Sequence, residues 1–468
     1  MSATDKFARI AALRPSRRGT ATGTRVEAGA AGDRLGELLG AGVNRNHYGE
    51  HLSLRQWYST PEMCSPDARA LCLLLPQSAD GEDFAAAALD PAQWLFLDTE
   101  TTGLAGGTGT YAFMVGVAWW EAGGLQVEQF FLRDLNEEHS LLLELAERMK
   151  ERPVLVTFNG KCFDWPLLET RYRMTRSLPA FTPSVHLDLL HPARQLWRLR
   201  IGSVRLRDLE RHVLGRGGCV LDWSRHDDID SSLIPQMYFD YLRGGPAEPI
   251  AGIFRHNQMD LRGLAALAGR ILALLSSGAG SAADAQVNID DPIETLGLSR
   301  ILRKRGEQTR ARKLYETALL SGLPGSLKRL AQRELAQLAK RQFDYTRAVS
   351  LWSALREPPA RGTHSNQSPF LPEDARRAVE SSIEATEQLA IHYEHRAKDP
   401  NRALALVREA IREVQAARRS GMITREYEMR ICTRLTRRLE RLERRCAAPE
   451  PLFHRSPKAT LRKAPALT

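Results

Sequence analysis

The chain has 468 residues, of which 43% are hydrophobic and 26% charged, a composition typical of globular proteins and a length that predicts at least two domains. It has no uninterrupted apolar stretch of about 20 residues and no apolar N-terminal signal, so we expect no membrane span, no secretion and a cytoplasmic location. The six cysteines show no CxxC pair, which argues against a zinc site and favours reduced thiols.

The net charge of +10 is unevenly distributed along the chain. From Arg300 to the C-terminus there are 36 Lys and Arg against 19 Asp and Glu, whereas the first 299 residues hold 30 and 37. The acidic half suits a metal site built from carboxylates. The basic half fits either a module that binds a polyanion or a soluble, Arg-rich helical surface.

Residues 1–35 lack apolar periodicity and predict a disordered basic arm, and residues 36–90 predict an irregular lead-in. Over residues 91–275, short apolar runs alternate with helical periodicity, which predicts an α/β domain with a mixed sheet flanked by helices. We expect strands at 94–97, 111–120, 126–132, 154–158 and 185–187, and helices from 136, at 163–174, 206–214, 235–242 and 250–275.

Residues 276–292 are small and polar and predict a linker, and residues 293–446 are helical throughout. Three segments begin with the same Ala-x-x-Leu pattern, at Ala311, Ala348 and Ala403, so the offsets are 37 and 55 residues. This all-α region resembles tetratricopeptide repeats, with an ordinary helical bundle as the alternative. Residues 447–468 predict a basic disordered tail.

Asp98-Thr99-Glu100 follows the apolar run at 94–97. Side chains two apart in an extended chain point to the same side, so Asp98 and Glu100 can converge on one cation. Adjacent carboxylates repel each other unless a divalent ion neutralises them, and oxygen ligands suit Mg²⁺ or Mn²⁺. The pattern therefore predicts a metal site, whereas an isolated Asp-x-Glu more commonly means surface charge.

Two further segments carry polar groups next to apolar elements. Asp164 is expected in the first turn of the helix after the strand at 154–158, where complementing the helix dipole is the alternative role. His256 and Asp260 are four residues apart in a predicted helix and share a face. An imidazole beside a carboxylate can orient or accept a proton. The alternative is a solvent-exposed His/Asp pair without a catalytic role.

In this order, Asp98 with Glu100, then Asp164, then Asp260 resemble the motifs of the DEDD superfamily of exonucleases, which have an RNase H-like fold. His256 departs from that pattern, because it occupies the position that holds Tyr in one subfamily. Arg255 stands where the other subfamily has His, so the chain matches neither subfamily fully.

A second resemblance covers about residues 90–275. The runs 187–197 and 206–210, then Ile234-Pro235 and the segment 256–261, are similar to the YprB-type RNase H-like domain. The resemblance implies the domain class and leaves the substrate open.

The exonuclease resemblance implies a metal-dependent 3′–5′ exonuclease, a hydrolase that cleaves phosphodiester bonds of DNA or RNA by a two-metal-ion mechanism. Two Mg²⁺ or Mn²⁺ ions would bind Asp98, Glu100, Asp164 and Asp260, and His256 would orient or deprotonate the attacking water. The residues implied to contact the terminal nucleotide are Thr101, Leu104, Asn159 and Phe163.

The expected partner is a nucleic acid with a 3′ end, and the C-terminal helices would bind either that nucleic acid or a protein. Two other functions stay open. One is a noncatalytic adaptor that retains an RNase H-like fold, and the other is a structure-specific endonuclease.

Overall fold

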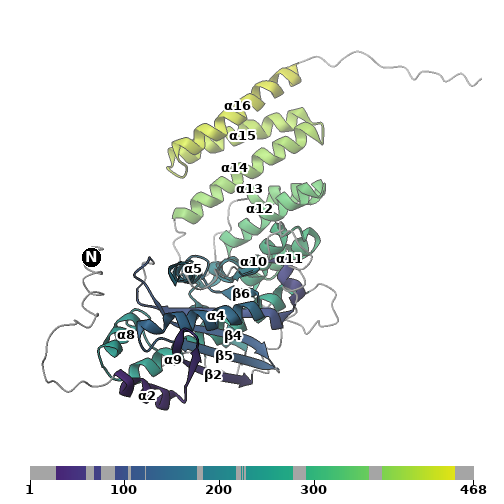
Figure 1. The fold of residues 1–468 in the computed structure, drawn as a ribbon. Helices are drawn as coiled ribbons and strands as arrows, with labels where there is room; N and C mark the ends of the chain where they lie inside the picture. Colours follow the sequence, from purple (N-terminus) through teal and green to yellow (C-terminus); the bar gives the residue numbers. More distant parts are fainter. Residues whose placement is uncertain are drawn as a thin grey trace, which may run out of the picture. The chain divides into compact units, whose positions relative to one another are not determined.

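The computed structural model describes residues 28–59, 68–74, 90–103, 107–121, 123–175, 183–217, 223, 225, 228–277, 291–357 and 372–447. The chain divides into two compact units, Met1–Leu314 and Tyr315–Thr468. The first is an α/β unit and the described part of the second is entirely helical, so the predicted fold class is confirmed (Figure 1).

A seven-stranded mixed sheet forms the centre of the first unit, in the order β1-β2-β5-β4-β3-β6-β7. Strands β1 to β5 pair antiparallel, and β6 and β7 extend the sheet from β3 in parallel. The strands are β1 (Gly42–Asn46), β2 (Gly49–Ser59), β3 (Trp94–Thr101), β4 (Ala112–Glu121), β5 (Gly124–Phe131), β6 (Val154–Thr157) and β7 (Val185–Asp188).

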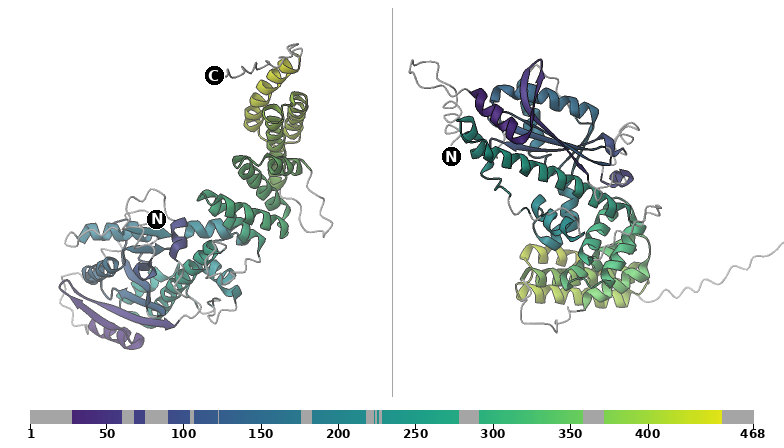
Figure 2. Two further views of the ribbon diagram at one scale, coloured as in Figure 1. Left: turned by 90° about the vertical axis from the view of Figure 1, so that its right-hand side faces the viewer. Right: turned by 90° about the horizontal axis from the view of Figure 1, so that it is seen from below.

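Helices cover both faces of this sheet. The long helix α9 (Glu248–Ser276) packs against β3, β4 and β5 and runs along one side of the sheet (Figure 2). Successive β3 side chains alternate between the faces, so Asp98 reaches α9 while Thr99 contacts α5 (Asp164–Thr175) on the other side. Helix α4 (Glu138–Glu151) contributes its apolar face to the core beside Leu97.

The remaining helices of this unit are shorter. They are α2 (Ala28–Leu39), α6 (Leu190–Ile201), α7 (Leu206–His212), α8 (Ile234–Leu242) and α10 (Pro292–Lys304), with 3-10 turns at η1 (Ala68–Leu73), η2 (Pro91–Gln93), η3 (Leu135–Glu137) and η4 (Leu214–Gly217). The sequence did not predict α6.

Residues 36–90 were predicted to form an irregular lead-in, but strands β1 and β2 lie within this range and belong to the sheet. Strand β2 pairs with β5 from Leu52↔Phe131 to Ser59↔Gly124, and β1 extends the sheet beyond it. Leu52 and Leu54 are buried and alternate with polar neighbours, a period-two pattern that was present but short. Helix α2 also replaces the end of the predicted disordered arm.

The predicted start of the helical domain at 293 also differs from the division at Leu314 and Tyr315. Helix α10 packs on α6, where Trp197 Nε1 donates to Glu294 Oε1 over 2.6 Å. A Cβ at Gly297 would lie 2.7 Å from the Leu196 carbonyl oxygen, so glycine permits this close approach. Residues 293–314 therefore belong to the α/β unit.

In the second unit, the described helices from residue 325 onward stack, each against the next (Figure 2). The three repeated alanines, Ala311, Ala348 and Ala403, are fully buried, as expected for small residues where helices cross. The helices are α11 (Gln308–Leu320), in which the division falls, α12 (Gly325–Arg341), α13 (Tyr345–Arg356), α14 (Pro372–His395), α15 (Pro400–Arg419) and α16 (Arg425–Ala447).

Several predicted segments lie outside the described residues: the arm up to residue 27, the linker from 278 to 290 and the tail from 448. Across the described helices, none combines the length and the apolar character needed to span a lipid bilayer.

Candidate functional site

Asp98 and Glu100 lie inside strand β3, which continues to Thr101, rather than just past the strand as the sequence suggested. They follow four fully buried apolar residues, which fix this strand in the centre of the sheet. The register between β3 and β4 shifts after Glu100, and such irregularities re-aim side chains at the edge of a site. Both carboxylates point to the face covered by α9, as period-two alternation predicts.

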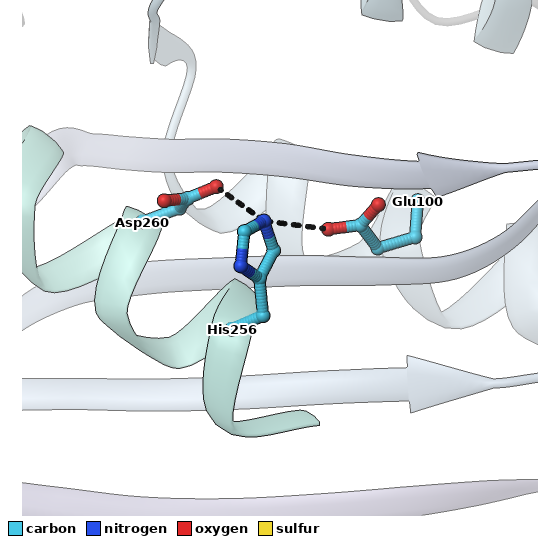
Figure 3. Close-up of side chains that lie close together, drawn as sticks. All are labelled: Glu100, His256 and Asp260. Carbon is cyan, nitrogen blue, oxygen red and sulfur yellow. Dashed lines mark ion pairs between the residues drawn. The ribbon is translucent and has the colours of Figure 1, made fainter. Parts of the chain in front are cut away.

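Helix α9 brings His256 and Asp260 to the same place, one turn apart (Figure 3). The His256 Nε2 atom lies 3.9 Å from Glu100 Oε1 and 3.5 Å from Asp260 Oδ2. One ligand atom from each of these three residues falls within 4.8 Å of the others. The predicted shared face of the helix is thus turned inward, and the exposed His/Asp alternative is excluded because His256 is buried. Arg255, one residue earlier, is exposed.

Close packing of α9 on the sheet depends on Gly116 of β4, which pairs with Asp98. A Cβ there would lie 2.0 Å from Asn257 Oδ1, so only glycine leaves room for this side chain. Asn257 Nδ2 donates to Asp98 Oδ2 over 2.8 Å, and its own Oδ1 accepts from Gln129 Nε2 over 2.8 Å. Gln258 extends this series of hydrogen bonds by donating to Gln129 Oε1. These amides fix the Asp98 carboxylate.

Asp164 opens helix α5, as predicted, on the other face of β3. Its Oδ1 accepts a 2.5 Å hydrogen bond from Thr99 Oγ1. The preceding loop is held by Asp188 at the end of β7, whose carboxylate accepts from the backbone N–H groups of Asn159 and Lys161. Asp188 also accepts from the N–H of Leu190 at the start of α6, so it anchors loops.

Burial and neighbouring carboxylates shift the pKa values of the acidic groups on β3. Burial raises the pKa of Asp98 well above its usual range, and Asp260, Glu100 and Asp164 raise it further, against the hydrogen bond from Asn257. Burial likewise raises the pKa of Glu100, again with help from Asp260 and Asp164. Burial also raises the pKa of Asp164. Asp164 and Asp260 thus both act on the β3 carboxylates, although Asp164 belongs to α5 and contacts Thr99 from the other face of the strand.

Asp228, which the sequence did not single out, orients His256. Its Oδ1 lies 2.6 Å from His256 Nδ1, and its pKa is lowered because hydrogen bonds and charge from His256 and Arg225 outweigh burial. An ionised carboxylate only accepts hydrogen bonds, so Nδ1 carries the proton and Nε2 faces Glu100 and Asp260.

Arg225 holds the same loop to α9 and was also missed. Its guanidinium lies 2.6 Å from Asp260 Oδ1, 3.2 Å from Asp228 Oδ2 and 2.6 Å from Glu210 Oε1 on α7. Glu210 is completely buried, and burial raises its pKa to about 8. A Cβ at Gly263 would lie 1.8 Å from Glu210 Oε1, so this glycine makes the pocket for the pair.

The residues predicted to contact a nucleotide have different positions. Phe163, directly before Asp164, is 59% exposed and so does not belong to the core. Asn159 lies in the loop between β6 and α5 with a φ of 67°, and Thr101 ends β3 with its hydroxyl donating to the Gly103 carbonyl. Leu104 lies outside the described residues.

The donor set fits a hard divalent ion. Carboxylate oxygens dominate it, with one imidazole nitrogen, which suits Mg²⁺ or Mn²⁺. Carboxylates this close stay ionised together only when a cation offsets their repulsion. Arg225 supplies one positive charge, at Asp260.

Residues 95–272 match the family model of the RNase H superfamily. The chain is also 35% identical over 173 residues to the uncharacterized protein YprB of Bacillus subtilis (strain 168). That alignment covers 37% of this chain and 40% of the relative, so the chain spans about two fifths of the relative's length.

Proposed function

We propose that the α/β unit is a metal-dependent 3′–5′ exonuclease, a hydrolase of DNA or RNA. The observation that carries the proposal is the meeting of Glu100, His256 and Asp260 beside Asp98 and Asp164 in an RNase H-superfamily domain. The resemblance to DEDD exonucleases assigns the four carboxylates to two Mg²⁺ or Mn²⁺ ions. Bound there, the ions would supply an activated water and stabilise the departing 3′ oxygen.

The chain's own groups have distinct tasks in this proposal. Asp98, fixed by Asn257, and Glu100 would hold ions from β3, and Asp164 and Asp260 would hold them from the two flanking helices. His256, with Nδ1 bound to Asp228, would take a proton from the attacking water at Nε2.

Phe163 would contact the terminal nucleotide, because an exposed ring next to the carboxylates offers a stacking surface. Thr101 and Asn159, at the ends of β3 and β6, would line the same approach to the site. Leu104 remains part of this proposal through its position after the first motif.

The test uses linear and circular strands of DNA and RNA with Mn²⁺ or Mg²⁺. The proposal expects nucleoside monophosphates from linear strands, no cleavage of circles, and loss of activity in Asp98→Asn. Asp240→Asn is the matched control, since this carboxylate is exposed on α8 and contacts its near neighbours Gln236 and Arg243. Cleaved circles would indicate an endonuclease. No cleavage of any strand would contradict the proposed activity.

Mn²⁺ binding separates an active nuclease from a noncatalytic adaptor that retains the fold. A ligand that binds the native state raises the melting temperature, so an intact site predicts stabilisation by millimolar Mn²⁺. The stabilisation should be lost in Asp98→Asn and kept in Asp240→Asn. An unchanged melting temperature in the wild type would favour the adaptor.

A further inference from the structure

A cleft of about 370 Å³ lies within the second unit, among α12, α13 and α14. Its lining includes Arg333, Lys340 and Arg341 from α12, and one carboxylate, Glu384 from α14. Arg333 Nε pairs with Glu384 Oε2 over 2.7 Å, and Lys340 Nζ donates to the neutral Gln388 side chain over 2.8 Å. The lining therefore carries net positive charge, which favours an anionic ligand.

Phe343, in the turn between α12 and α13, forms one edge of the cleft. Its side chain is 73% exposed and its φ is 61°, in the left-handed region. Equivalent turns, each five residues before a buried alanine of the repeat, have Gly306 with φ 87° and Lys398 with φ 57°. A bulky residue is strained there, and a ring that is mostly exposed contributes little burial to offset that strain.

Phe343 thus has both a strained backbone and an exposed aromatic ring, and this combination points to a role in binding. Tyr345, which also lines the cleft, has its ring centroid 6.4 Å from that of Phe343. Aromatic rings beside cations are the features by which proteins hold single strands, because each base offers a face for stacking and each phosphate a negative charge. An acidic peptide would match the charge but offers no such series of planar faces.

We propose that this cleft binds a single-stranded segment of nucleic acid, with Phe343 stacked on a base and Lys340 and Arg341 facing phosphates. The choice of nucleic acid over other polyanions rests on the proposed function. The site itself is separate from the metal centre, because its described lining residues all belong to the second unit.

The experiment measures binding of a labelled single-stranded oligonucleotide by fluorescence anisotropy, with the full chain carrying Asp98→Asn and with EDTA present. Phe343→Gly should weaken binding about 5- to 100-fold, the range expected for one stacked base. Glycine adopts a positive φ without strain, so this variant should melt no lower than its parent. Lys398→Gly is the matched control, since it removes an exposed cation from the same kind of turn and should leave the Kd unchanged within about twofold.

An oligonucleotide of abasic sites tests the stacking directly, because Phe343→Gly should then bind it as tightly as the parent does. Lys340→Gln and Arg341→Gln should each lower the slope of log K against log salt by about 0.7, the value for one phosphate contact on a single strand. Equal binding of the intact oligonucleotide by Phe343→Gly and its parent would overturn the proposal. Polyglutamate competing as well as the oligonucleotide would also overturn it. If this binding pattern appears but the wild type releases no nucleotides, the cleft stands and the proposed exonuclease fails.

Discussion

Replacing Gly263 by alanine would place a methyl group against the buried side chain of Glu210. The new Cβ would lie 1.8 Å from Oε1 and 2.8 Å from Cδ, closer than real atoms approach. Glu210 is completely buried, so its carboxyl group can move only by breaking its 2.6 Å contact with Arg225. Breaking a buried pair costs about 3–5 kcal/mol, and the better helix propensity of alanine returns about 1 kcal/mol. We expect Gly263→Ala to lower the free energy of unfolding by about 2–4 kcal/mol.

Urea unfolding followed by circular dichroism measures this change. Gly269→Ala is the matched control on the same helix, since no atom lies within 4 Å of its added Cβ, and it should raise the free energy of unfolding by about 0.5–1 kcal/mol. Gly263→Ala should also weaken Mn²⁺ binding, because Arg225 holds Asp260 and Asp228 in place. Equal stability of Gly263→Ala and wild type would refute the packing argument.

Three further outcomes follow from the site. Asp228→Asn should lower kcat about 10- to 100-fold with little change in KM, because it weakens the hydrogen bond that orients His256. Steady-state kinetics measure both constants, and equal changes in kcat and KM would contradict this prediction. In EDTA, the free energy of unfolding should fall as pH rises above about 4.5, because folded Asp98 and Glu100 retain protons that the unfolded chain has released. Mn²⁺ should remove this pH dependence. Urea titrations at several pH values, with EDTA and with Mn²⁺, measure it, and equal pH dependence under the two conditions would contradict the prediction. Phe163→Ala should raise KM about 5- to 100-fold with intact stability, and an unchanged KM would exclude stacking there.

Much of the site was accessible from sequence because its signals are local. Asp98 and Glu100 follow a buried strand, and His256 and Asp260 share a helical face, so periodicity alone predicts that each pair converges. The order of these motifs supplied the fold class as well. That the two pairs meet at one site was expected only from the resemblance to a known family, because their spacing in the sequence does not indicate that α9 packs on β3.

The supporting residues had no such signal. Arg225 and Asp228 come from an irregular segment without periodicity, and Glu210 looks like any acidic residue on a short helix. Their roles depend on tertiary contacts, above all on the room that Gly263 leaves. The β1–β2 hairpin was missed for a different reason: its alternating pattern around Leu52 and Leu54 is too short to distinguish from a loop.

The most direct test of the metal-dependent nuclease is nucleotide release from a 3′-labelled single strand with and without Mn²⁺. We predict that wild type and Asp240→Asn release labelled mononucleotide only with the metal, and that Asp98→Asn is at least about 100-fold slower, since the carboxylate supports several kcal/mol of charge stabilisation. Equal release by Asp98→Asn and wild type, or release unaffected by EDTA, would contradict the account.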